Sequence, residues 1–141
     1  MKNSSLLTLF ILLHTPAFSQ TIEEEKAAIA KTIEFYFEGM MEGDLDKLAL
    51  AFDSNARLIG YLGETFLAIP YQDWAAEMAK AEKLNPGDFS NELIGLELKG
   101  YTAMAKTEGF WPGIYYFDYL TLVKIDGKWK IVHKTWYEEK R

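Results

Sequence analysis

The dipeptide Asp126-Gly127 constrains the fold of this chain most, because it separates two runs that are rich in β-branched and aromatic residues. A two-residue turn of type I′ needs positive φ at both central positions, and Asp-Gly adopts that conformation readily. The sequence therefore predicts a β-hairpin over residues 114–137. With a regular ladder, Leu122 pairs with Ile131 and Leu120 pairs with His133.

The register of this hairpin predicts which side chains share a face, because strand side chains alternate between the two faces of a sheet. One face begins with apolar residues near the turn, including Leu122 and Ile131. Its far end becomes polar and carries Tyr116, Asp118, His133, Thr135 and Tyr137. Asp118 and His133 are diagonal neighbours in this register, so the carboxylate and the imidazole are expected to lie within reach of each other.

The opposite face of the hairpin carries Phe117, Tyr119, Val132 and Trp136. A contiguous apolar stripe of this kind is typical of a covered surface. A self-complementary sheet face suits a two-fold homodimer, which is the expected partner. Cover by another part of the same chain, such as its third helix, is the alternative.

Residues 1–19 have the pattern of an export leader, with a basic residue, an apolar run from Leu6 to Phe18 and a small-x-small cleavage site. The run is well short of the roughly 20 apolar residues of a bilayer span, and His14 and Pro16 interrupt it. We therefore expect no membrane association and an exported protein, periplasmic or secreted. Residues 20–141 suffice for one domain and are too few for two ordinary ones.

The composition excludes several classes of partner and cofactor. The formal net charge is −6, and one unit more negative once Lys2 leaves with the leader, which disfavours nucleic acid. No cysteine is present, so no disulfide can form. His133 is the one histidine outside the leader, whereas zinc sites use three or four nitrogen or sulfur ligands. We therefore expect no metal and no other cofactor.

Helical patterns precede the strands along the chain. Apolar residues at helical spacing predict a helix over residues 22–41 with Thr21 as its N-cap, and a short helix after Asp44. A third helix is expected after Pro70. The remaining segments read as strands, at residues 57–62, 65–69, 92–99 and 102–107. Helices followed by a strand meander predict an α+β fold, in which a curved antiparallel sheet wraps around the helices as a cone with an internal pocket.

Two segments carry a resemblance to a known family: Leu48 to Arg57 (LALAFDSNAR) and Asp118 to Thr135 (DYLTLVKIDGKWKIVHKT). With the order of elements, they resemble the nuclear transport factor 2-like (SnoaL-like) superfamily, and within it the family labelled putative lumazine-binding. The resemblance implies a cystatin-like cone with a pocket between the concave face and the long N-terminal helix, and often a dimer through the convex face. This superfamily contains isomerases, dehydratases and non-catalytic pockets, so the resemblance does not select one function.

The preferred functional hypothesis is a pocket for a small, largely apolar molecule. The candidate ligand-binding residues are Tyr36, Tyr61, Trp111, Tyr116, Thr135 and Tyr137. Trp111 is placed in a loop over residues 109–113, either as a flap that contacts the ligand or as a cap on the open end of the core.

An enzyme is the second hypothesis. A lyase or isomerase without a cofactor would use His133 to exchange a proton, while Asp118 orients the ring and tyrosines donate to an oxyanion. Alternatively, Asp118 and His133 only satisfy each other as buried polar groups. The third class is a non-catalytic accessory or interaction domain, whose functional surface is the sheet face.

Overall fold

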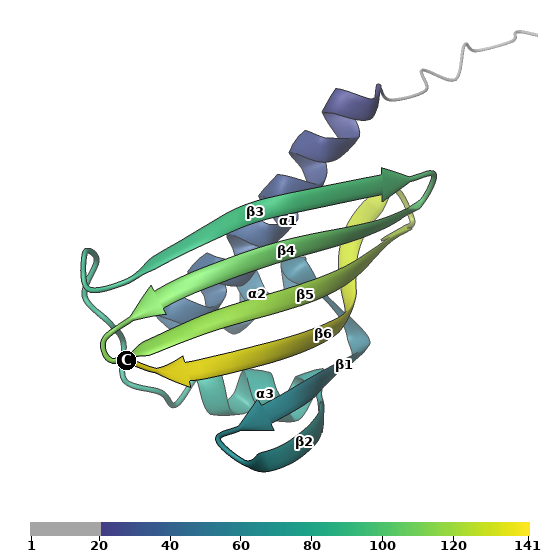
Figure 1. Ribbon diagram of the computed structural model, residues 1–141. Coiled ribbons are helices and arrows are strands. Elements are labelled where there is room, and N and C mark those ends of the chain that lie inside the picture. The colour runs from purple at the N-terminus through teal and green to yellow at the C-terminus, as the bar shows by residue number, and fades with distance from the viewer. Residues whose placement is uncertain (1–20) are drawn as a thin grey trace, which may run out of the picture.

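The computed structural model describes residues 21–141, so the predicted export leader at residues 1–19 lies outside the described residues. The elements are α1 (Ile22–Glu42), α2 (Leu45–Ala51), β1 (Phe52–Leu62), β2 (Thr65–Pro70), α3 (Tyr71–Met78), β3 (Ser90–Lys99), β4 (Thr102–Trp111), β5 (Ile114–Ile125) and β6 (Lys128–Lys140). All three helices lie on one side of a curved sheet (Figure 1). We call the face that they cover the inner face, and the opposite one the outer face.

The predicted α+β architecture is confirmed, with one correction to the sheet. The six strands are ordered β2-β1-β6-β5-β4-β3. Neighbouring strands are antiparallel except for β1 and β6, which run parallel. The sheet is therefore mixed, because the last strand returns to pair with the first across the middle of the sheet.

The two first helices begin and end at local sequence features. The side chain of Thr21 accepts a hydrogen bond from the Glu24 backbone amide at 3.2 Å, and the Glu24 carboxylate accepts one from the Thr21 amide at 2.7 Å. This capping box satisfies amides that would otherwise lack partners. Gly43 ends α1 in the left-handed conformation with φ of 64°. Asp44 then caps α2 through the amides of the next turn.

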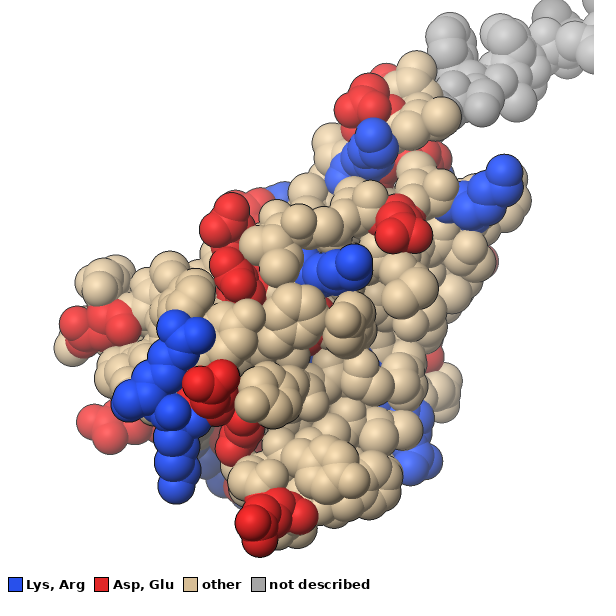
Figure 2. Space-filling model, viewed as in Figure 1, with Lys and Arg blue, Asp and Glu red and all other residues tan. Residues whose placement is uncertain are grey.

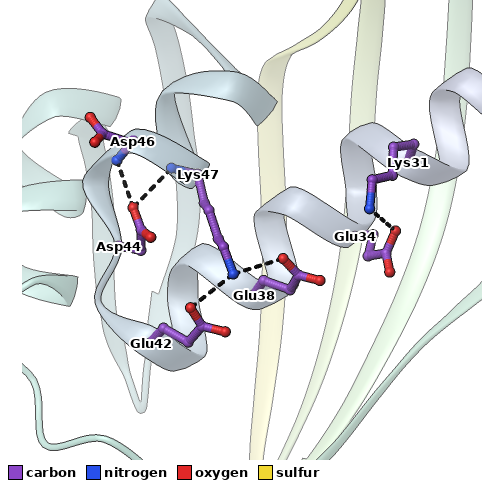
Figure 3. A network of polar contacts seen from close by, with 7 residues as sticks. All are labelled: Lys31, Glu34, Glu38, Glu42, Asp44, Asp46 and Lys47. Atoms are coloured by element: carbon purple, nitrogen blue, oxygen red, sulfur yellow. Dashed lines mark hydrogen bonds and ion pairs between the residues drawn. The ribbon is translucent and has the colours of Figure 1, made fainter.

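An ion-pair network joins α1 to α2 (Figure 3). The Lys47 ammonium lies 2.9 Å from the Glu38 carboxylate and 2.8 Å from that of Glu42. These carboxylates raise the pKa of Lys47 above its ordinary value through hydrogen bonds. The network is exposed to solvent, so we assign it a role in orienting the two helices and little net stability.

The core lies between α1, α2 and the inner face of the sheet. Ile29 and Ile33 of α1 and Leu48 of α2 are at most 1% exposed, as are Leu120 and Leu122 of β5. Burial of each such side chain stabilises the fold by about 1.5–3 kcal/mol. This packing holds α1 along the inner face and so determines where the space beneath the sheet remains open.

The β5–β6 hairpin has the predicted turn, since φ is 49° at Asp126 and 77° at Gly127. The pairing of Leu122 with Ile131 is also as predicted. Beyond that pair, β6 contains a β-bulge, and the next residue of β5, Thr121, pairs with His133. One residue is thus inserted into β6, which reverses the facing of every later side chain relative to a regular ladder.

The prediction that Asp118 and His133 share a face is therefore wrong. Leu120 pairs with Lys134, so Lys134 takes the inner position that the regular register assigned to His133. The same reversal carries Thr135 and Tyr137 to the outer face, and it carries Trp136, predicted for the outer face, to the inner one.

A second bulge lies in β3, between Leu93 and Gly95. Leu93, Leu96 and Leu98 pack against the core, whereas Ile94 is 43% exposed. Strict alternation along the strand would put Ile94 on the same face as Leu96 and Leu98, and the bulge at Ile94 is the reason for the difference. Within residues 21–141, no helix is long and apolar enough to cross a bilayer.

Candidate functional site

A cavity of about 180 Å³ lies between the inner face of the sheet, α1 and α3. Its walls are largely aromatic and aliphatic. Residues with apolar or aromatic side chains that line it are Phe37, Met40, Leu58, Leu62, Leu67, Trp74, Met78, Trp111, Tyr116 and Trp136. A mostly apolar wall with a few polar groups is the usual composition of a small-molecule site.

A polar cluster stands at the inner end of this cavity, on four different elements. Tyr36 of α1 donates a hydrogen bond to Oδ2 of Asp118 in β5 at 2.7 Å. Thr107 of β4 donates to the same oxygen at 3.3 Å. Lys134 of β6 donates to the Tyr36 hydroxyl at 2.5 Å, and its ammonium lies 3.1 Å from Oδ1 of Asp118. Asp118 and Lys134 are 5% and 7% exposed, so this ion pair is buried.

Oδ1 of Asp118 is the buried side-chain atom that lacks a hydrogen bond within residues 21–141. The Lys134 ammonium supplies charge at 3.1 Å, but its geometry is not that of a hydrogen bond to Oδ1. The carboxylate therefore has one oxygen, Oδ2, that accepts two hydrogen bonds, whereas Oδ1 is held by the ion pair alone and can accept a further hydrogen bond. Because Asp118 lines the cavity, a donor on a bound molecule would satisfy Oδ1.

The environment keeps the Tyr36 phenol neutral. Burial raises its pKa well above the ordinary value, and the charge of Asp118 and the hydrogen bond to it act in the same direction. Tyr36 therefore remains a donor to Asp118 at physiological pH. The Lys134 ammonium also lies 4.9 Å from the centre of the Tyr36 ring and 5.5 Å from that of Trp74, within cation–π range.

Four of the eight predicted site residues line the cavity: Tyr36, Trp111, Tyr116 and Asp118. The other four are Tyr61, His133, Thr135 and Tyr137, and none of them is part of its lining. His133 pairs with Thr121, and both side chains are on the outer face of the sheet. The imidazole therefore cannot exchange a proton with a molecule beside Asp118, which faces the cavity. Tyr61 is 53% exposed and contributes its carbonyl, which accepts a hydrogen bond from Trp136.

Trp111 ends β4 instead of lying in a loop, so the predicted flap is absent from its position. Its indole N–H donates to Oδ1 of Asn91 at 3.1 Å, and its ring centre lies 4.7 Å from that of Tyr116. A Cβ atom on Gly109 would come within 2.7 Å of the same Asn91 oxygen. Glycine is thus required there for this contact, which fixes Trp111 as a rigid part of the cavity wall.

Sequence reasoning missed Lys134, Trp74, Trp136 and Glu138, all of which line the cavity. One signal was present for Trp136. In a regular strand, odd-numbered and even-numbered residues face opposite sides. The buried residues Trp129 and Ile131 are at odd positions, whereas the large residue Trp136 is at an even position. To place Trp129, Ile131 and Trp136 on one face, the strand needs an inserted residue between Ile131 and Trp136. The structure contains this insertion as the β-bulge.

The model of the family described as putative lumazine-binding matches residues 24–137. The chain belongs to this family. No curated protein matches it. Among residues 21–141, no group of three or more histidine, cysteine, aspartate or glutamate side chains is arranged to hold a metal ion.

Solved structures with the same fold include NTF2-like proteins of unknown function from two bacteria. The Silicibacter pomeroyi protein is 26% identical, with a TM-score of 0.78, and the match covers 85% of this chain and 100% of that one. The Shewanella baltica protein is 22% identical, with a TM-score of 0.79 and coverage of 87% and 100%. A domain with a cystatin-like fold from Nostoc punctiforme, 16% identical, has a TM-score of 0.62 and coverage of 86% and 80%. The chain is therefore an NTF2-like, cystatin-like domain.

Proposed function

We propose that this protein binds a small, largely apolar molecule in the cavity beneath its sheet. The observation that carries the proposal is Oδ1 of Asp118, a buried acceptor in the cavity lining without a hydrogen bond. The surrounding rings supply apolar contact area, and rigid aromatic walls lose little entropy when a ligand binds. A ligand with one inward-pointing N–H or O–H group would complete the cluster of Asp118, Lys134 and Tyr36.

The four tryptophans offer a direct test, because three of them line the cavity and one does not. Trp129 is instead held by Glu25, whose Oε2 accepts from its indole N–H at 2.7 Å. We expect the neutral phenol tyrosol, 4-(2-hydroxyethyl)phenol, to shift the ¹H–¹⁵N indole signals of Trp74, Trp111 and Trp136 in a saturable way. The Trp129 signal is the internal control. Equal shifts at all four signals, or none at the three, would contradict the proposal.

We further propose that the outer face of the sheet pairs with a second copy of the chain. Phe117 and Tyr119 remain on this face, whereas Trp136 has turned inward and leaves the predicted interface. Val132 is the residue inserted at the bulge and has no partner in the register. Tyr137 takes the place of Trp136 and is 57% exposed, beside Tyr119 at 47%. Figure 2 shows mainly uncharged side chains over the lower part of this face, with a basic side chain near the middle of the view and acidic ones on either side of it. An exposed aromatic stripe of this kind suits a self-complementary two-fold contact.

Tyr119→Glu is expected to weaken this dimer at least tenfold, because it would bury a carboxylate against its symmetry mate without a partner. Sedimentation equilibrium over a range of protein concentrations measures the effect. Tyr101→Glu is the matched control, since Tyr101 is 74% exposed at the β3–β4 turn. A wild-type protein that stays monomeric at high concentration would rule out the interface, as would equal weakening by both variants.

A further inference from the structure

Two carboxylates besides Asp118 line the cavity, Glu108 and Glu138. Glu108 accepts a hydrogen bond from the Tyr115 hydroxyl at 3.2 Å. Glu138 lies nearer to the end of β6. Its Oε1 accepts a hydrogen bond from the Gly63 backbone amide at 3.3 Å. Within the described part of the chain, no lysine or arginine forms an ion pair with Glu138, whereas Asp118 is paired with Lys134. The cavity thus combines a compensated charge pair at its inner end with an uncompensated negative charge toward its rim.

Asp118 and Glu138 are neighbouring carboxylates on the inner face. Asp118 pairs with Trp136, and the next inner-face pair is Tyr116 with Glu138. Asp118 and Glu138 are therefore diagonal across the strands, a relation in which the Cα atoms lie about 7–8 Å apart. Both carboxylates act on Tyr116. Burial contributes most to the raised pKa of its phenol, and the charges of Glu138 and Asp118 raise that pKa further. A ligand about one aromatic ring long would reach from one carboxylate to the other.

Aromatic rings flank the path between these carboxylates. The Trp136 ring lies directly against the backbone of β1 at Gly60. The contact is so close that a Cβ atom on Gly60 would lie 2.4 Å from a ring carbon of Trp136. One face of this indole is therefore pressed on Gly60, while the residue also lines the cavity. Trp111 and Tyr116 form a second aromatic wall. Indole faces attract cations by about 0.5–2 kcal/mol, so the rings reinforce the preference that Glu138 sets.

From this arrangement we propose that the cavity selects an organic cation: an elongated aromatic molecule with a neutral hydrogen-bond donor at its inner end and an ammonium group at its outer end. The donor binds Oδ1 of Asp118, and the ammonium binds Glu138 and the adjacent rings. An anionic ligand is disfavoured because its charge would face Glu138 without a free cation beside it. This inference rests on the proposed function of the cavity and adds the chemical class of the ligand.

Three phenols of similar size test the selectivity by isothermal titration calorimetry at pH 7. They are tyramine, which carries an ammonium group, neutral tyrosol, and anionic 4-hydroxyphenylacetate. We expect tyramine to bind at least tenfold more tightly than tyrosol, and the anion to bind more weakly than tyrosol. Glu138→Gln should reduce the advantage of tyramine over tyrosol to less than about threefold.

Glu139→Gln is the control for general attraction of cations, because Glu139 is exposed and lies on the opposite face, paired with Tyr115. It should preserve the advantage of tyramine. Equal affinities for tyramine and tyrosol would overturn the cation selectivity, and so would equal effects of the two glutamine variants. In either case binding of tyrosol, read from the Trp136 indole signal, would leave the ligand-binding function standing. Failure of all three phenols to bind would overturn this inference.

Discussion

Lys134→Met is expected to lower the free energy of unfolding by about 3–5 kcal/mol, because it leaves the Asp118 carboxylate buried without its cation. Both side chains are more than nine-tenths buried, so water cannot replace the ammonium at low cost. A domain of this size is stable by only about 5–15 kcal/mol, so the loss would be a large fraction of the total. Urea denaturation followed by far-UV circular dichroism measures it.

Two further variants identify the cause of this loss. Adding Asp118→Leu to Lys134→Met removes both charges, and the double variant should recover most of the stability, since apolar pairs commonly replace buried ion pairs without net cost. His133→Gln should cost less than about 1 kcal/mol, because His133 is half-buried on the outer face. A greater loss from His133→Gln than from Lys134→Met would contradict the bulged register.

Tyr36→Phe is expected to cost about 1.5–3 kcal/mol at neutral pH, because it removes hydrogen bonds that join the phenol to Asp118 and Lys134. The ring itself is conserved by this change, so its packing in the core is retained. The variant should also leave Lys134 without one of its acceptors. Chemical denaturation at pH 7 measures the difference from the wild type.

The same substitution should show a pH dependence whose sign follows from the raised pKa of Tyr36. In the unfolded chain this phenol loses its proton near pH 10, whereas the folded protein retains it to higher pH. The stabilisation is fully present below pH 10 and is lost as the pH rises through the folded pKa. The stability difference between wild type and Tyr36→Phe should therefore shrink above pH 10, by up to about 1.4 kcal/mol per pH unit. A difference that stays constant from pH 9 to pH 11 would argue against a buried, neutral phenol.

The parts of the fold that depend on local chemistry were predictable from the sequence. Thr21 and Asp44 cap the helices that the sequence assigned to them, and Asp126-Gly127 forms the expected turn. Each of these signals acts over a few residues and does not depend on distant parts of the chain. The layered arrangement then follows, because the apolar stripe of α1 needs a sheet face to cover it.

The register beyond the turn was not predictable in the same way, because a β-bulge depends on packing across the whole sheet. The irregularity in β6 coincides with one in β1, where Phe52 pairs with Ile131 but Arg57 pairs with His133. The pairing of a distant strand thus contributes to the position of the inserted residue. A period-two pattern cannot show such an insertion, although the even number of Trp136 is consistent with it.

Half of the predicted site residues line the cavity, because aromatic residues and an aspartate in an apolar context attract attention on chemical grounds. Lys134 escaped notice because lysine is rarely buried, and a single sequence does not show which carboxylate compensates its charge. The assignment of His133 as the reactive base had the opposite cause, since its titration near neutral pH made it the most plausible acid–base group. The geometry instead places a lysine and a neutral phenol beside Asp118.

The bulge in β6 turns Lys134, and not His133, into the cavity beside Asp118. Nuclear Overhauser contacts test it most directly in a uniformly labelled sample. We predict contacts from the side-chain methylene protons of Lys134 to ring protons of Tyr36 and Trp74, and none from the His133 ring to either. Contacts between the His133 imidazole and the Tyr36 ring, with Lys134 exposed to solvent, would mean that β6 has no bulge and keeps the regular register.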